Sequence, residues 1–248
     1  MTDTEVVVHP DTTELVAAAA SRLMSRIVDA QAARGSASVV LTGGGVGIGL
    51  LRALRDSPSR DTIDWSRLDL WWGDERFLPA GDPERNETQA REALLDHVPV
   101  DPARVHPMPA SDGPDGDDPD AAAERYAAEL AAASPGQRLP RFDVFLLGVG
   151  EEGHVASIFP ESPAAREEVR LVVAVRGCPK PPPVRISLTF PAISGADEVW
   201  LAAAGAAKAP VIGMALSGAD PIQVPAAGVR GDQRTLWLLD REAATAAP

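Results

Sequence analysis

Hydrophobic residues recur along the chain in two patterns, short continuous runs and longer stretches with a helical period. The first helix is predicted over residues 11–34, where apolar side chains recur every fourth position from Leu15 to Ile27. Asp11 stands where a capping residue is expected, and Gly35 is a suitable stop. The sequence therefore predicts an amphipathic helix with defined ends close to the N-terminus.

Short apolar runs alternate with helical stretches along the rest of the chain. Strands are predicted at 38–41, 68–72 and 142–147, near 170–175, at 197–203 and at 236–239. Helices are predicted after the glycine-rich residues 42–49 up to about residue 56, near 86–96, at 119–133 and near 206–217. Such alternation implies βαβ units. We expect an α/β fold, a single domain over 1–248 with a largely parallel, Rossmann-like open sheet and helices on both faces.

Composition and charge narrow the class of protein. The 248 residues are 45% hydrophobic, and no apolar run approaches the ~20 residues that span a bilayer. The acidic N-terminus lacks the positive start of a signal peptide, and a single cysteine, Cys178, excludes an internal disulfide framework. We expect a cytoplasmic protein without membrane partners.

A net charge of −13 argues against nucleic acid as a partner, because phosphate backbones require clustered Lys and Arg. The same charge repels anionic metabolites at long range, so a phosphate site must be locally basic. Among 23 basic residues only Lys180 and Lys208 are lysines. This bias is compositional and by itself indicates no mechanism.

The segment 148–160 is the strongest candidate for chemistry. It follows the predicted strand 142–147 and runs through a glycine-rich turn to His154, where a short helix is predicted to begin. Ligands of open α/β sheets bind outside the carboxyl ends of the strands. His154 is therefore a catalytic candidate, and a structural histidine satisfied by backbone groups is the alternative.

Gly148, Gly150 and Gly153 also match the dinucleotide pattern G-x-G-x-x-G. That pattern expects an acidic residue after the next strand, whereas the run 171–175 ends in Arg176. A dinucleotide-binding oxidoreductase is therefore disfavoured.

A second glycine-rich loop, Thr42-Gly43-Gly44-Gly45, lies between a predicted strand and a predicted helix. Amides at a helix N-terminus bind anions, and glycine lets a phosphate approach them closely. Leu50 after Gly49 does not fit the P-loop pattern, so a nucleoside triphosphate is less favoured than a single phosphate. The loop fits a single phosphate, or else a tight turn without a ligand.

Other polar residues also follow strands. Asp74 and Arg76 come after the run 68–72, in a segment that a solvated loop with ion pairs would also explain. Lys208 stands at the start of a helix, where a cation opposes the helix dipole unless an anion lies nearby. The four histidines and Cys178 show no metal-ligand spacing, so no metal is expected.

Five segments in this order resemble the 6-phosphogluconolactonases, which share a superfamily with the glucosamine-6-phosphate deaminases. They are Thr42–Gly45, Trp72–Arg76 with Arg85-Asn86, Gly148–Pro160, Arg185–Thr189 and Lys208. Glu152 replaces the aspartate usual before the histidine, and Gly45 replaces a hydroxyl residue. Phe159, where the deaminases carry glutamate, and Arg76, where they carry an aromatic residue, favour the lactonase branch.

The resemblance implies hydrolysis of 6-phospho-D-glucono-1,5-lactone, a step of the pentose phosphate pathway, without metal or organic cofactor. His154 would act as general base, and Asp74 would orient sugar hydroxyls or the histidine. The amides of Gly43 to Gly45 would hold the phosphate together with Arg185 and Lys208. Arg76 would join them or stabilise the oxyanion.

The resemblance also leaves some properties open. A monomer or weak homo-oligomer is expected, and a deaminase or a non-catalytic sugar-phosphate sensor domain stays open as an alternative. Against the sensor, the 37 or so residues before the strand at 38–41 read as one helix, too little for a DNA-binding helix-turn-helix domain.

Overall fold

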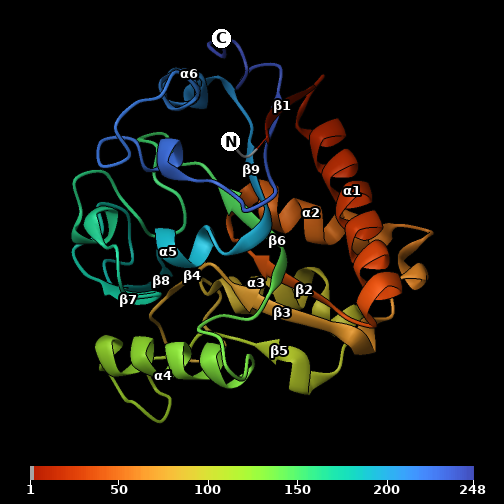
Figure 1. Cartoon of the computed structure of the whole chain (residues 1–248), viewed down its shortest axis with the longest axis vertical. Helices are drawn as coiled ribbons and strands as arrows, with labels where there is room; N and C mark the ends of the chain where they lie inside the picture. Colours follow the sequence, from red (N-terminus) through yellow and green to blue (C-terminus); the bar gives the residue numbers. More distant parts are fainter. Residues whose placement is uncertain (1–2) are drawn as a thin grey trace.

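The computed structural model describes residues 3–248 (Figure 1). Its strands are β1 Asp3–His9, β2 Ala37–Leu41, β3 Leu68–Trp72, β4 Asp74–Arg76, β5 Val105–His106, β6 Phe142–Gly148, β7 Val172–Val175, β8 Arg185–Leu188, β9 Ala196–Ala203 and β10 Arg234–Asp240. Its helices are α1 Thr12–Arg34, α2 Gly44–Asp56, α3 Asn86–Ala93, α4 Pro119–Ala132, α5 Phe190–Ile193 and α6 Ala209–Leu216.

The strands form two sheets of different character. Within residues 3–248, seven strands pair in the order β1-β10-β9-β6-β2-β3-β5, and every pair in this sheet is parallel. A smaller sheet, β4-β8-β7, is antiparallel. The predicted α/β class and the largely parallel sheet are confirmed.

Chain direction places the helices on both faces of the main sheet. The connections β1 to β2 and β2 to β3 cross the sheet one way, and those from β5 to β6, β9 and β10 return the other way. Right-handed crossovers therefore put α1 and α2, which contact each other, on one face and α4 and α6 on the other. The small sheet lies between α5 and α4 in Figure 1.

The order reverses between β2 and β6, which are neighbours. The chain leaves β2 toward β3 and leaves β6 toward β9, so their connections diverge. A crevice at the carboxyl ends of two such strands is the usual ligand site of an open α/β sheet.

An aromatic cluster fixes the end of β3 below this crevice. The Trp71 ring stacks on His106 with ring centroids 3.8 Å apart and meets Tyr126 edge-on. The buried Tyr126 hydroxyl accepts a hydrogen bond from the Trp72 amide and donates one to the His106 carbonyl. Helix α4 is thereby tied to β3 and β5, immediately before the residues that enter the site.

The predicted ends of the first helix are confirmed. The Asp11 side chain accepts a hydrogen bond from the amide of Glu14, and Gly35 ends the helix in the left-handed region with φ of 83°.

The predicted helix at His154 is wrong. Residues 151–160 form turns, and Gly153 and Ala156 adopt positive φ values of 86° and 49°. Two such residues within four positions break a right-handed helix. The turn is instead closed by hydrogen bonds from the Gly150 amide to the His154 carbonyl and from the Gly153 amide to the Gly150 carbonyl.

Two further departures concern strands. The segment before α1 is not helix alone, because β1 forms an edge of the main sheet with Val6 and Val8 exposed. The strand predicted near 170–175 exists as β7 but belongs to the small sheet, paired with β8, which was not predicted. Both departures concern strands that pair with segments distant in the sequence, β1 with β10 and β7 with β8.

Candidate active site

A cavity of about 460 Å³ lies at the carboxyl ends of the strands, where β2 and β6 diverge. Loops after β2, β3, β6 and β9 supply its walls, together with β8 and the segment that precedes it. All nine residues selected from the sequence line it: Thr42, Gly43, Gly44, Gly45, Asp74, Arg76, His154, Arg185 and Lys208. The structure therefore brings together residues that are up to 166 positions apart in the chain.

The glycine loop forms the first turn of α2 at the cavity wall. Gly43 is the N-cap and Gly44 adopts φ of +80°, a conformation that favours glycine. A side chain at Gly43 would overlap the Asn86 amide group. The first amides of a helix have no acceptor within it, so this turn offers N–H groups to an anion.

The imidazole of His154 packs directly against Gly150, in the space that a side chain at position 150 would fill. A β-carbon at Gly150 would overlap the imidazole, so only glycine accommodates this ring position. On another side the Phe159 ring lies 4.5 Å from the imidazole, centroid to centroid. The Nδ1 atom is buried and lies 3.3 Å from Oε1 of Glu152, within ion-pair distance but outside hydrogen-bond geometry. His154 lines the cavity, and its other nitrogen, Nε2, makes no hydrogen bond among the described residues, so it can serve a ligand there.

The surroundings of His154 favour its neutral form. Burial lowers the pKa of His154 and Lys180 adds to that effect, whereas Glu152 and Asp74 oppose it. The net pKa lies below the ordinary value, so the imidazole is uncharged near neutral pH. A neutral imidazole with one nitrogen facing a cavity can accept a proton.

Glu152 is shared between two partners. Its Oε1 faces His154, and its Oε2 accepts a hydrogen bond from Nζ of Lys180 at 2.9 Å. Partial burial works toward a higher pKa of Glu152, but a backbone hydrogen bond and Lys180 outweigh it. The pKa of Glu152 therefore lies below its usual value, and the group stays a carboxylate.

Asp74 is buried beneath the cavity in a fixed orientation. Its Oδ2 accepts a hydrogen bond from the Ser157 hydroxyl at 2.7 Å and lies 3.9 Å from Nη1 of Arg185. The Asn86 side-chain amide donates to the Asp74 carbonyl at 2.8 Å. These contacts leave Oδ1, which has only a long 3.4 Å contact with Asn86, as the oxygen with spare acceptor capacity.

Four cations line the cavity: Arg76, Lys180, Arg185 and Lys208. Arg76 donates to the Glu84 carbonyl, and Arg185 is largely buried with its charge 5.6 Å above the Phe159 ring. Burial and the nearby Lys180 lower the pKa of Lys208, while Glu151 and Glu152 oppose the shift. The cavity is thus locally basic in a strongly acidic chain, as an anionic ligand requires.

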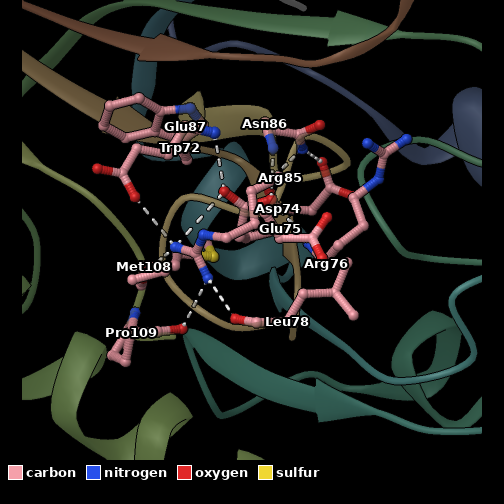
Figure 2. A network of polar contacts seen from close by, with 12 residues as sticks. Trp72, Asp74, Glu75, Arg76, Leu78, Arg85, Asn86, Glu87, Met108 and Pro109 are labelled. Carbon is pink, nitrogen blue, oxygen red and sulfur yellow. Dashed lines mark hydrogen bonds and ion pairs between the residues drawn. The ribbon is translucent and has the colours of Figure 1, made fainter. Parts of the chain in front are cut away.

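Beneath these residues, Glu75 and Arg85 form a buried polar network, which Figure 2 shows. The Glu75 side chain is 0% exposed and accepts hydrogen bonds from the amides of Arg76, Asn86 and Glu87. Arg85, 1% exposed, lies 3.7 Å from Glu75 and donates to the carbonyls of Leu78 and Met108. The network fixes β4 against the start of α3, and so places Asp74, Arg76 and Asn86.

Sequence reasoning missed part of this site. No role was predicted from the sequence for Lys180 or Glu152, and Asn86 entered only with the resemblance to a family. Both lysines of the chain line this cavity, although the scarcity of lysine in the sequence does not by itself indicate a site. Among residues 3–248, no three His, Cys, Asp or Glu side chains gather as they would around a metal ion. None of the helices in that range has the length and apolar character needed to cross a membrane.

Comparisons with known proteins give consistent relatives. Residues 10–237 match the family model of glucosamine-6-phosphate isomerases/6-phosphogluconolactonase. A 6-phosphogluconolactonase of Streptomyces coelicolor is 65% identical over 100% of this chain and 97% of its own length. One of Mycobacterium tuberculosis is 55% identical over 97% of each chain.

Solved structures show the same fold. The 6-phosphogluconolactonase of Trypanosoma brucei superposes with a TM-score of 0.83 at 30% identity, covering 98% of both chains. A monomeric glucosamine-6-phosphate deaminase gives a TM-score of 0.80 at 20% identity over 98% of this chain and 99% of its own. The second likeness shows a common fold alone.

Replacing Arg85 with methionine is expected to destabilise the protein in a pH-dependent way. Burial raises the pKa of Glu75 to about 7 from 4.5, although Arg85 and the three amides oppose the shift. Folding therefore favours protonated Glu75, and that contribution is lost as pH rises through about 7. Without Arg85 the pKa rises further, so the loss reaches about 3–5 kcal/mol near pH 8 and is smaller near pH 5.5.

Urea unfolding of both proteins at the two pH values measures this difference. Arg91→Met is the matched control, because Arg91 is exposed and pairs with Glu87 four residues earlier, a contact worth about 0.5 kcal/mol or less. An equal loss for Arg85→Met at both pH values would show that Glu75 is not held by this cation.

Proposed function

The chain belongs to the family of glucosamine-6-phosphate isomerases and 6-phosphogluconolactonases, and we propose that it hydrolyses 6-phospho-D-glucono-1,5-lactone to 6-phosphogluconate through His154. The full-length similarity to 6-phosphogluconolactonases supports the reaction. The observation that carries the mechanism is the His154 ring, with Nδ1 against Glu152 and Nε2 left for a basic cavity.

The lactone is already an activated ester, so its hydrolysis requires little apparatus. Neutral His154 takes a proton from water as the water oxygen attacks the C1 carbonyl. The resulting imidazolium, stabilised by Glu152, then donates that proton to the ring oxygen as the C1–O bond breaks. Arg76 stabilises the developing oxyanion or assists the phosphate, and Asp74 orients the sugar hydroxyls.

The phosphate is assigned to the first turn of α2, to Arg185 and to Lys208. Thr42 to Gly45 supply amides and a hydroxyl, and Lys208 supplies a charge next to the same cavity. Arg185 contributes Nη1, because its Nε and Nη2 already donate to carbonyls of 180–182. No metal or organic cofactor takes part in this scheme.

Phe159 favours lactone hydrolysis over deamination. Its ring contacts both the imidazole of His154 and the guanidinium of Arg185 and presents no carboxylate to either. A deaminase that relies on a glutamate at this position would lack its partner for the histidine. A sensor domain is the other alternative, but binding alone does not require a histidine whose lowered pKa keeps it neutral. We place the enzyme in the cytoplasm as a monomer or weak homo-oligomer.

The purified protein is expected to accelerate hydrolysis of the phosphorylated lactone above its spontaneous rate, with a chelator present. Loss of lactone is followed directly, and ammonia release from glucosamine 6-phosphate is measured on the same preparation. Ammonia production at a comparable rate would instead assign the chain to the deaminases.

Unphosphorylated gluconolactone is expected to be a poor substrate, lower by several orders of magnitude in kcat/KM. Each charged contact to the phosphate contributes about 1.5–3 kcal/mol, so two or three lost contacts account for that difference. Steady-state kinetics on both lactones provide the comparison. Similar kcat/KM values for the two would contradict the phosphate assignment.

His154→Ala is expected to lower kcat by about 10²–10⁴ and to leave 6-phosphogluconate binding nearly unchanged, because the phosphate contacts lie elsewhere. In the wild type, kcat/KM is expected to fall as protonation of His154 proceeds. Because the pKa of His154 is lowered, that fall occurs below the ordinary value of about 6.5.

His97→Ala is the matched control, since His97 is absent from the cavity lining. Melting temperature and product affinity are measured with kcat on each variant. A stable His154→Ala protein within about threefold of the wild-type kcat would exclude the general base, since such a base supplies far more.

A further inference from the structure

The two lysines of the chain line the same cavity but differ in their ion pairing. Lys180 and Lys208 are the only lysines among 23 basic residues, and both line the cavity. Lys208 has no ion pair within 4 Å among residues 3–248, whereas Nζ of Lys180 lies 2.9 Å from Oε2 of Glu152. Lys180 is therefore committed to the protein itself.

We propose that Lys180 is a positioning residue, whose ammonium group holds Glu152 against Nδ1 of His154 and so keeps Nε2 as the nitrogen that accepts the proton. The proposal rests on the proposed function, because it assigns a role to Lys180 in the same reaction. It separates Lys180 from the residues that bind the phosphate.

Two contacts connect Lys180 to the imidazole, one from Lys180 to Glu152 and one from Glu152 to His154. The two carboxylate oxygens of Glu152 are divided, Oε2 to Lys180 and Oε1 to Nδ1 of His154 at 3.3 Å. An acceptor at Nδ1 favours the tautomer that carries its proton there, which leaves the lone pair on Nε2. Contacts of this kind commonly tighten on the way to the transition state.

Without Lys180, the Glu152 carboxylate keeps two contacts among the described residues, the His154 ring and the backbone amide of Glu152 itself. Glu152 is about one-third exposed, so a free carboxylate could rotate into water. The ion pair removes that freedom before substrate binds. Preorganisation of this kind is what makes a catalytic contact effective, because no reorganisation is needed during the reaction.

The backbone that carries Lys180 is itself fastened to the site. Arg185 donates from Nη2 to the carbonyls of Lys180 and Pro181 and from Nε to that of Pro182. The Cys178 amide also donates to the Pro183 carbonyl, which closes the segment. Arg185 therefore fixes the starting point of the Lys180 side chain, in addition to any contact with the phosphate.

Charged side chains near the imidazole of His154 shift its pKa in opposite directions. Glu152 and Asp74 favour the protonated imidazole, and Lys180 disfavours it. Lys208 interacts electrostatically with Lys180, Glu151 and Glu152. Lysine suits this place because its compact ammonium contacts one carboxylate oxygen, whereas a guanidinium fork would engage both and withdraw Glu152 from the ring.

The first test reads the ring directly and requires no substrate. In ¹⁵N NMR of the full-length protein, His154 is assigned by comparison with His154→Ala. We expect the Nδ1–H tautomer in the wild type and in Lys208→Met, and a mixture of tautomers in Lys180→Met. An unchanged tautomer in Lys180→Met would overturn the proposal, whatever the enzyme's activity proves to be.

The second test is a double-mutant cycle with the phosphorylated lactone. Lys180→Met is expected to lower kcat by ~10- to 100-fold with little change in KM, because it disturbs geometry and not binding. In a Glu152→Gln background the same change should alter kcat by less than about twofold, because the carboxylate through which Lys180 acts is already absent.

Lys208→Met is the matched control in this cycle, and we expect it to raise KM equally in both backgrounds. If Lys180→Met also raises KM equally in both, Lys180 binds the phosphate and the proposal is wrong. A wild-type protein without lactonase activity would refute the proposed function instead, and the tautomer measurement would still decide the role of Lys180.

Discussion

The carboxylate of Glu75 is the group on which the geometry of the cavity depends most. It is fully buried, and three backbone amides and Arg85 converge on it. An ion pair in such a place contributes little net stability, because desolvation offsets most of the attraction. Its effect is specificity, since one orientation of β4 against α3 satisfies all these groups at once. Glu75 thereby fixes the strand that carries Asp74 and Arg76, and both of these residues line the cavity.

Much of this arrangement follows from local sequence. The glycine turns, the helix caps and the apolar runs are local signals, and parallel strands necessarily deliver their following loops to one edge of the sheet. For that reason His154, Asp74 and the loop at 42–45 could be selected without a structure. Lys208 was selected from its place at the start of a helix, Arg185 was added by the resemblance to a family, and both line the cavity.

What local sequence did not predict depends on contacts between distant segments. Strand β8 exists because it pairs with both β4 and β7, and nothing in residues 185–188 requires an extended chain on its own. The turns after His154 depend on positive φ at Ala156, a residue that ordinarily favours helix. The contact of Lys180 with Glu152 joins positions 28 residues apart through two side chains, and no periodicity reports such a pair.

Two glycines in the site are defined by what occupies the space beside them. The Asn86 amide lies where a side chain of Gly43 would be, and the imidazole of His154 lies where one of Gly150 would be. A substitution at either glycine therefore depends on what residue stands at the neighbouring position. A descendant of this chain can enlarge Gly43 only after shortening Asn86, and it can enlarge Gly150 only by giving up the position of the imidazole. The first exchange leaves a route for gradual divergence, whereas the second closes it for as long as the chemistry is kept.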